Sequence, residues 1–143
     1  MNNQLLNQVV KFAKTVGYVL LATADKKGIP HIATAGELQY DIDQNLIKVT
    51  QWFCSKTVAN LQVNNYIAIA VWQPEIDKGY QLQGSLEEVR NISILDGYSV
   101  KETQELFPQI RKELLVKIEE VTEFCHAVHS DENLLGQQKE VGS

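Results

Sequence analysis

Three consecutive residues, Ser55, Lys56 and Thr57, combine two hydroxyls and an ammonium where an apolar run gives way to a helical pattern. The backbone N–H groups in the first turn of a helix have no partner within the helix, and the Ser55 hydroxyl can accept only one of them. Val58 stands where a capping box would place Glu, so no carboxylate in this turn accepts a hydrogen bond from the remaining backbone N–H groups. Together these groups could bind a phosphate.

Lys56 is unusual at the start of a helix because its charge opposes the positive end of the helix dipole. In isolation this costs roughly a few tenths to 1 kcal/mol, and a bound phosphate would reverse the sign of that cost. The alternative is that Lys56 is simply solvated and that water satisfies the free N–H groups. Gln51 and Trp52 lie just upstream, where a flat aromatic ligand could rest with hydrogen-bonding amides near its edge.

A second group of polar side chains, Cys125, His126 and His129, is followed by Asp131 and Glu132. On a helix, His126 and His129 could share a face and bind a metal, but their spacing fits no standard zinc pattern and a second half-site is missing. A polar exit from the last strand explains the same residues. We therefore expect no metal site.

Cys54 and His31 each allow two interpretations. The neighbouring Lys56 could favour a reactive Cys54 thiolate, whereas a buried cysteine would be inert. His31 could act as a base or could face solvent. The sequence contains no Gly-rich dinucleotide motif, nucleophile elbow or paired-carboxylate signature, so no catalytic residue is assigned.

Hydrophobic periodicity predicts the elements that must position these residues. Residues 3–15 have the spacing of an amphipathic helix, which Gly17 ends. Strands are expected at residues 18–24, 32–40, 46–52, 66–72, 80–89 and 114–124, and further helices at residues 55–64 and 92–107. The polar turn at residues 25–28 is typical of a hairpin.

The strand pattern predicts a mainly β fold with flanking helices. Short turns join most of the six strands, which favours an antiparallel sheet. Strands 18–24 and 66–72 are apolar on both faces, so one face can fill a barrel while the other needs a helix or a partner chain as cover. We expect a closed or nearly closed barrel that dimerises through its outer face, one domain over residues 1–143, and a loosely held tail from about residue 131.

Charge and composition narrow the classes of partner. The chain has 18 acidic and 13 basic side chains and a formal net charge of −5, which argues against a nucleic-acid surface and an anionic membrane. No apolar stretch reaches the roughly eighteen residues of a transmembrane helix, and the polar N-terminal residues do not resemble a signal peptide. Two cysteines do not make a disulfide framework, so we expect a cytoplasmic protein.

Three ordered segments carry a resemblance to a known family: residues 20–34, 46–72 and 79–89. Over residues 17 to about 90 the chain resembles the FMN-binding split-barrel family related to pyridoxamine 5'-phosphate oxidase. The resemblance implies a six-stranded Greek-key split barrel, a homodimer, and FMN bound in clefts at the subunit interface.

The resemblance also implies cofactor-binding residues. The positions that match the family's phosphate-holding segment, together with an Asn that braces the loop, are Ser55, Lys56, Thr57 and Asn60. The positions that match strands beside or flanking the isoalloxazine ring are Thr34, Thr50, Gln51 and Trp52. Gln81 falls near the family's glutamine–arginine segment on the fifth strand.

The chain departs from the full-length oxidases in two respects. Lys56 is the one basic group in the motif, where the oxidases carry an arginine-rich clamp, and no Trp or Arg after Phe124 matches their substrate-binding C-terminal segment. We therefore expect an FMN-binding oxidoreductase that acts on another small molecule, with NAD(P)H as electron donor. The alternatives are an FMN carrier or sensor without dedicated turnover, and a barrel that has lost its cofactor.

Overall fold

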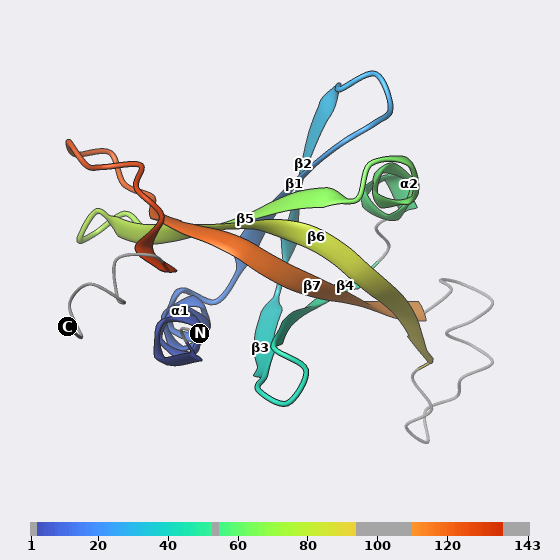
Figure 1. Cartoon of the computed structure of the whole chain (residues 1–143), viewed down its shortest axis with the longest axis horizontal. Coiled ribbons are helices and arrows are strands. Elements are labelled where there is room, and N and C mark those ends of the chain that lie inside the picture. Colours follow the sequence, from blue (N-terminus) through green and yellow to red (C-terminus); the bar gives the residue numbers. More distant parts are fainter. Residues whose placement is uncertain (1–2, 53–54, 94–109, 136–143) are drawn as a thin grey trace.

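The computed structural model describes residues 3–52, 55–93 and 110–135 (Figure 1). Within these ranges the chain forms two helices and one seven-stranded antiparallel sheet in the order β2-β1-β5-β6-β7-β4-β3. The helices are α1 (Asn3–Val16) and α2 (Ser55–Val63). The strands are β1 (Val19–Ala24), β2 (Pro30–Ala35), β3 (Glu37–Asp41), β4 (Leu46–Trp52), β5 (Tyr66–Gln73), β6 (Lys78–Ser93) and β7 (Ile110–Glu123).

Helix α1 forms because its apolar residues recur on one side. Leu6, Val9 and Ala13 are buried, and the helix packs against β3 and β5. It ends at Gly17, which adopts a φ of 101° and donates its N–H to the carbonyl of Ala13 at 2.8 Å. A glycine in this left-handed conformation is a common helix terminator. The predicted helix and its end are confirmed.

Asp25 shapes the hairpin loop between β1 and β2. Its carboxylate accepts the backbone N–H groups of Lys27 at 2.8 Å and Ile29 at 2.9 Å, and its carbonyl accepts that of Gly28 at 2.9 Å. Gly28 has a φ of 85°, a conformation that glycine adopts without strain. The predicted hairpin is confirmed, and it projects from the barrel beside α2 (Figure 1).

The strand predicted over residues 32–40 is two strands rather than one. Gly36 separates β2, which pairs with β1, from β3, which pairs with β4. These strands stand at opposite ends of the strand order, so the chain itself joins the two ends of the sheet at Gly36. The predicted class, an antiparallel split barrel, is confirmed, and the break at Gly36 raises the strand count from six to seven.

Strands β6 and β7 form a long ribbon that extends past the predicted ends. Ile92 and Ser93 pair with Arg111 and Ile110 in this ladder, so the helix predicted over residues 92–107 is wrong at its start. Its remaining residues, 94–107, lie outside the described part of the chain. The ribbon contains a register shift at Gly84, where an added Cβ would lie 1.9 Å from the carbonyl oxygen of Lys117.

The core lies inside the barrel, with α1 against one side. Its largest fully buried side chains come from β1, β4, β5, β6 and β7, and they are Leu21, Ile47, Ile69, Leu82 and Leu114. After β7, the side chain of Asn133 accepts the N–H of Val121 at 3.0 Å, and Leu134 and Leu135 pack against the core. The start of the tail is therefore attached to the barrel. Neither of the described helices is long and apolar enough to cross a membrane.

Candidate functional site

The elements that carry most of the predicted site residues meet at one seam of the barrel. Strand β4 leads into α2, which begins at Ser55 as predicted. Helix α2 packs against β1 and β2, and β2 also approaches β4 (Figure 1). Residues on β2, on β4 and in the first turn of α2 are therefore gathered by the closure of the sheet.

The first turn of α2 contains two exposed polar side chains and one buried hydroxyl. It contains no acidic residue, and Ser55 and Lys56 are exposed. Thr57 is 1% exposed, and its Oγ1 has no hydrogen-bond partner in the described part of the chain. A buried polar group left unpaired costs about 1–3 kcal/mol. An anion with several acceptor oxygens could satisfy both this hydroxyl and the free N–H groups of the turn.

Asn60, one turn further along α2, fixes the helix to β1. Its Nδ2 donates to Oγ1 of Thr23 at 3.1 Å, and the two side chains are 5% and 4% exposed. The sequence predicts a bracing role for Asn60 but does not identify its partner. Thr23 was missed because nothing distinguishes it from the other small residues of an apolar strand.

Thr50 borders a cavity of about 390 Å³ near the break between β2 and β3. Its side chain is 8% exposed, and it lies opposite Glu37 on β3 and Glu113 on β7. The cavity is also lined by residues from the end of α1 and the start of β3. Its size is within the range of small-molecule sites, so Thr50 adjoins a hollow that could hold part of a flat ligand.

Gln51 and Trp52 occupy the last two positions of β4. They pair with Lys112 and Arg111 at the start of β7. Two basic residues of β7 therefore lie opposite the two β4 positions that are predicted to flank the ring. The side chains of Gln51 and Trp52, together with Phe53 and Cys54, lie outside the described part of the chain.

Thr34 and Gln81 share the outer face of the sheet but are far apart on it. Thr34 pairs with Leu20, Leu20 with Ala70, and Ala70 with Gln81. Directly paired residues point to the same face, so these four side chains form one row. Three strand spacings of about 4.8 Å place Gln81 roughly 14 Å from Thr34 along the sheet. One copy of the chain therefore does not bring Gln81 to the other predicted residues.

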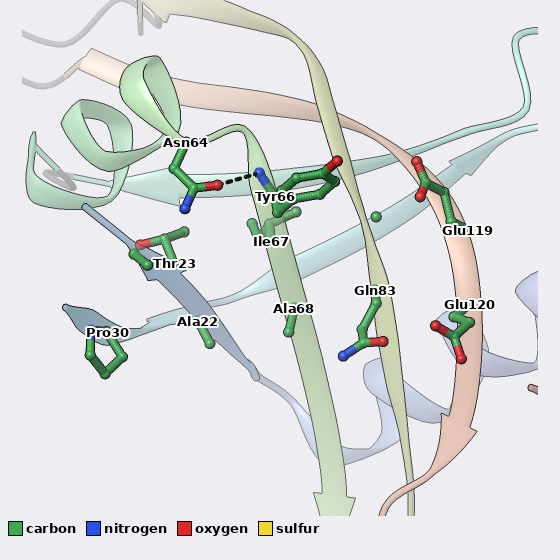
Figure 2. Close-up of a pocket in the computed structure, with 12 residues that line it drawn as sticks. Ala22, Thr23, Pro30, Asn64, Tyr66, Ile67, Ala68, Gln83, Glu119 and Glu120 are labelled. Carbon is green, nitrogen blue, oxygen red and sulfur yellow. Dashed lines mark hydrogen bonds between the residues drawn. The ribbon is translucent and has the colours of Figure 1, made fainter. Parts of the chain in front are cut away.

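The outer face also contains a cavity of about 470 Å³ beside the end of α2 (Figure 2). Ala22 and Ala68 form its apolar part, and Gln83 and Glu120 stand on the opposite side (Figure 2). Tyr66, at its rim, is 66% exposed. The described residues that line this cavity include acidic side chains but no lysine or arginine. It is therefore poorly suited to a phosphate.

The side chain of Asp77 binds the segment that follows β7. Its carboxylate accepts Nε1–H of Trp72 at 2.9 Å and the backbone N–H groups of His126 at 2.7 Å and Ala127 at 2.8 Å. These hydrogen bonds, that from His126 foremost, lower the pKa of Asp77. Nδ1 of His129 lies 2.7 Å from the carbonyl oxygen of Ala127. Throughout the described ranges, no three His, Cys, Asp or Glu residues are grouped to hold a metal ion.

Comparisons with known proteins identify the fold. A family model described as pyridoxamine 5'-phosphate oxidase matches residues 5–125. No curated protein matches the chain. A Clostridium acetobutylicum protein related to general stress protein 26 has a solved structure similar to this one, with a TM-score of 0.66 at 15% identity over 95% of this chain and 99% of that chain.

Two further solved structures share the fold. An FMN-binding protein from Syntrophomonas wolfei gives a TM-score of 0.63 at 18% identity, covering 90% of this chain and 91% of its own. HutZ, a heme storage protein from Vibrio cholerae, gives 0.51 at 15% identity, covering 80% and 91%. Identities this low show a common fold alone. The family model matches most of the chain, so the chain belongs to the pyridoxamine 5'-phosphate oxidase family.

Proposed function

We propose that the chain binds FMN through the first turn of α2 and uses it to transfer hydride or electrons to a small molecule. The observation that carries this proposal is the buried Oγ1 of Thr57, which has no hydrogen-bond partner among the described residues and lies at the start of a helix whose first turn has no acidic residue. The FMN phosphate would accept hydrogen bonds from this hydroxyl and from the free N–H groups of the turn. The exposed Ser55 and Lys56 would add a hydroxyl and a charge.

Each predicted residue then has a binding or orienting task. FMN supplies redox chemistry when bound, because its ring can accept and donate hydride or single electrons. The residues proposed to hold or support the phosphate are Ser55, Lys56, Thr57 and Asn60. The residues proposed to lie beside the ring are Thr34, Thr50, Gln51 and Trp52. Family membership and the fold shared with an FMN-binding protein support a flavin at this seam.

A homodimer is part of the proposal because the outer face of β1, β2 and β5 exposes apolar side chains in the described part of the chain. Ile32 and Tyr66 on this face are 67% and 66% exposed, and Ala22 and Ala68 lie between β2 and β6 on the same surface. Contiguous exposed apolar surface commonly marks an interface. A second copy could also supply its own Gln81 to a site that the first Gln81 does not reach. Light scattering after gel filtration should give a dimer, and a stable FMN-bound monomer would contradict this.

Flavin titration tests the cofactor assignment. Purified protein should quench the fluorescence of FMN with saturation at one equivalent per chain. Hemin is titrated in parallel, because one protein of similar fold is a heme storage protein. Hemin binding without FMN binding would contradict the proposal.

Turnover separates the enzyme from the carrier. The FMN-loaded protein is supplied with NAD(P)H and with small electron acceptors, and NAD(P)H oxidation is followed by absorbance. Steady oxidation that depends on the acceptor supports an oxidoreductase. Tight FMN binding without turnover supports the alternative, a carrier or sensor that exchanges electrons without a dedicated substrate.

A further inference from the structure

We propose that the buried hydrogen bond between Thr23 and Asn60 fixes the orientation of the first turn of α2 and thereby sets the affinity for the FMN phosphate. Thr23 is then a positioning residue that acts through Asn60 and does not touch the ligand. The inference deepens the proposed function and rests on it. Nothing in the sequence pattern of β1 assigns Thr23 such a role.

Helix α2 has little apolar surface with which to fix its orientation. Its buried residues are Thr57, Asn60 and Leu61, which the three- and four-residue spacing places on one face. Leu61, 2% exposed, is the one apolar residue among these three. Apolar contact is non-directional, so it holds the helix on the barrel without fixing its rotation or its slide along β1.

The hydrogen bond supplies the direction that the apolar contact lacks. Nδ2 of Asn60 and Oγ1 of Thr23 are 3.1 Å apart, and such bonds weaken steeply as distance and angle depart from their optimum. Thr23 pairs with His31 on β2, and its neighbour Ala22 pairs with Ala68 on β5. The acceptor is therefore part of the sheet, and the donor is part of the helix that it must align.

Asn60 lies one turn from the proposed phosphate site. Asn60 and Thr57 share the buried face of α2, so a rotation that misplaces one misplaces the other. Phosphate recognition by several donors at once tolerates little displacement, because each hydrogen bond weakens steeply as its distance and angle depart from their optimum. Loss of the Thr23 acceptor should therefore weaken the phosphate contacts while leaving the ring contacts on β4 in place.

The test compares FMN with riboflavin, which has the same ring but no phosphate. Thr23→Val keeps the shape of the side chain and removes the acceptor, and Thr23→Ser keeps the acceptor. We expect Thr23→Val to weaken FMN binding about tenfold and to leave the Kd of riboflavin unchanged. Thr23→Ser should bind FMN within about twofold of the parent, and the affinities are measured on protein whose folding is confirmed by circular dichroism.

The outcomes separate this inference from the function on which it rests. If Thr23→Val binds FMN as tightly as the parent, or loses FMN and riboflavin affinity equally, the positioning role is wrong. If the parent itself binds FMN no more tightly than riboflavin, the proposed phosphate site is wrong. Should Thr23→Val fail to fold, Thr23→Ala removes the same acceptor without adding bulk, and the same comparison applies.

Discussion

Thr57 and Asn60 lie one helical turn apart on the buried face of α2, and their hydrogen bonding differs. Asn60 donates to Thr23 across 3.1 Å, whereas Oγ1 of Thr57 has no partner in the described part of the chain. The Asn60 side chain therefore makes a structural contact with the sheet. The Thr57 hydroxyl is a candidate contact for a ligand.

Thr57→Val should change stability and affinity in opposite directions. Replacing an unpaired buried hydroxyl by a methyl group removes a desolvation cost, so the free energy of unfolding of the apo-protein should rise by about 1 kcal/mol. FMN binding should weaken, because one phosphate donor is lost. Urea denaturation and flavin titration measure the two effects, and Thr57→Ser serves as the control that keeps the hydroxyl. A variant that is both less stable and equally good at binding FMN would contradict the assignment.

Lys56→Glu should weaken FMN binding by at least about tenfold while the apo-protein stays folded. Lys56 is exposed, so the substitution disturbs no packing, and it places a carboxylate where the phosphate is proposed to lie. Lys11→Glu, at an exposed position of α1, a helix that lies away from α2 (Figure 1), makes the same change in net charge. If both variants lose FMN affinity equally, the effect is one of overall charge, and Lys56 has no special role.

Asp77→Asn should remove part of the loss of stability at acid pH. The folded-state pKa of Asp77 is lowered, chiefly by the N–H of His126. The ionised carboxylate therefore stabilises the folded state above the unfolded pKa, and this stabilisation is lost as pH falls through the folded pKa. That window lies below about pH 4, the ordinary range of Asp. Thermal melts across this range should show a flatter profile for the variant. An identical profile would mean that the ionised carboxylate of Asp77 does not stabilise the fold.

Gly84→Ala should destabilise the protein by about 2 kcal/mol or more, because the new Cβ would lie 1.9 Å from the carbonyl oxygen of Lys117 and force the β6–β7 ribbon apart. Gly36→Ala is the matched control. An added Cβ there has no atom within 4 Å, so it should cost less than about 1 kcal/mol. Chemical denaturation of both variants checks the register of the ribbon. Equal losses of stability would show that the shift at Gly84 is absent in solution.

The sequence predicts the elements whose boundaries are marked by turn and cap residues. Gly17 ends α1, Asp25 and Gly28 form the first hairpin, and β4 runs into α2 at Ser55 as expected. In each case a local signal agrees with the tertiary structure. These elements contain most of the candidate site residues, which is why the site could be proposed before the fold was known.

The remaining features depend on contacts between distant parts of the chain. The backbone bends at Gly36, but no local sequence signal marks the bend, and it becomes visible only when β2 and β3 are seen to pair at opposite ends of the sheet. The extension of β6 to Ser93 is likewise set by its ladder with β7. The pairing of Thr23 with Asn60 joins residues 37 apart in sequence, which no local pattern reports.

A crystal structure of the protein with FMN would show whether the first turn of α2 binds the phosphate. We expect a phosphate oxygen within about 3.2 Å of Oγ1 of Thr57, with other phosphate oxygens on the backbone N–H groups of the first turn of α2. A phosphate bound elsewhere, with Oγ1 of Thr57 still unpaired, would contradict it.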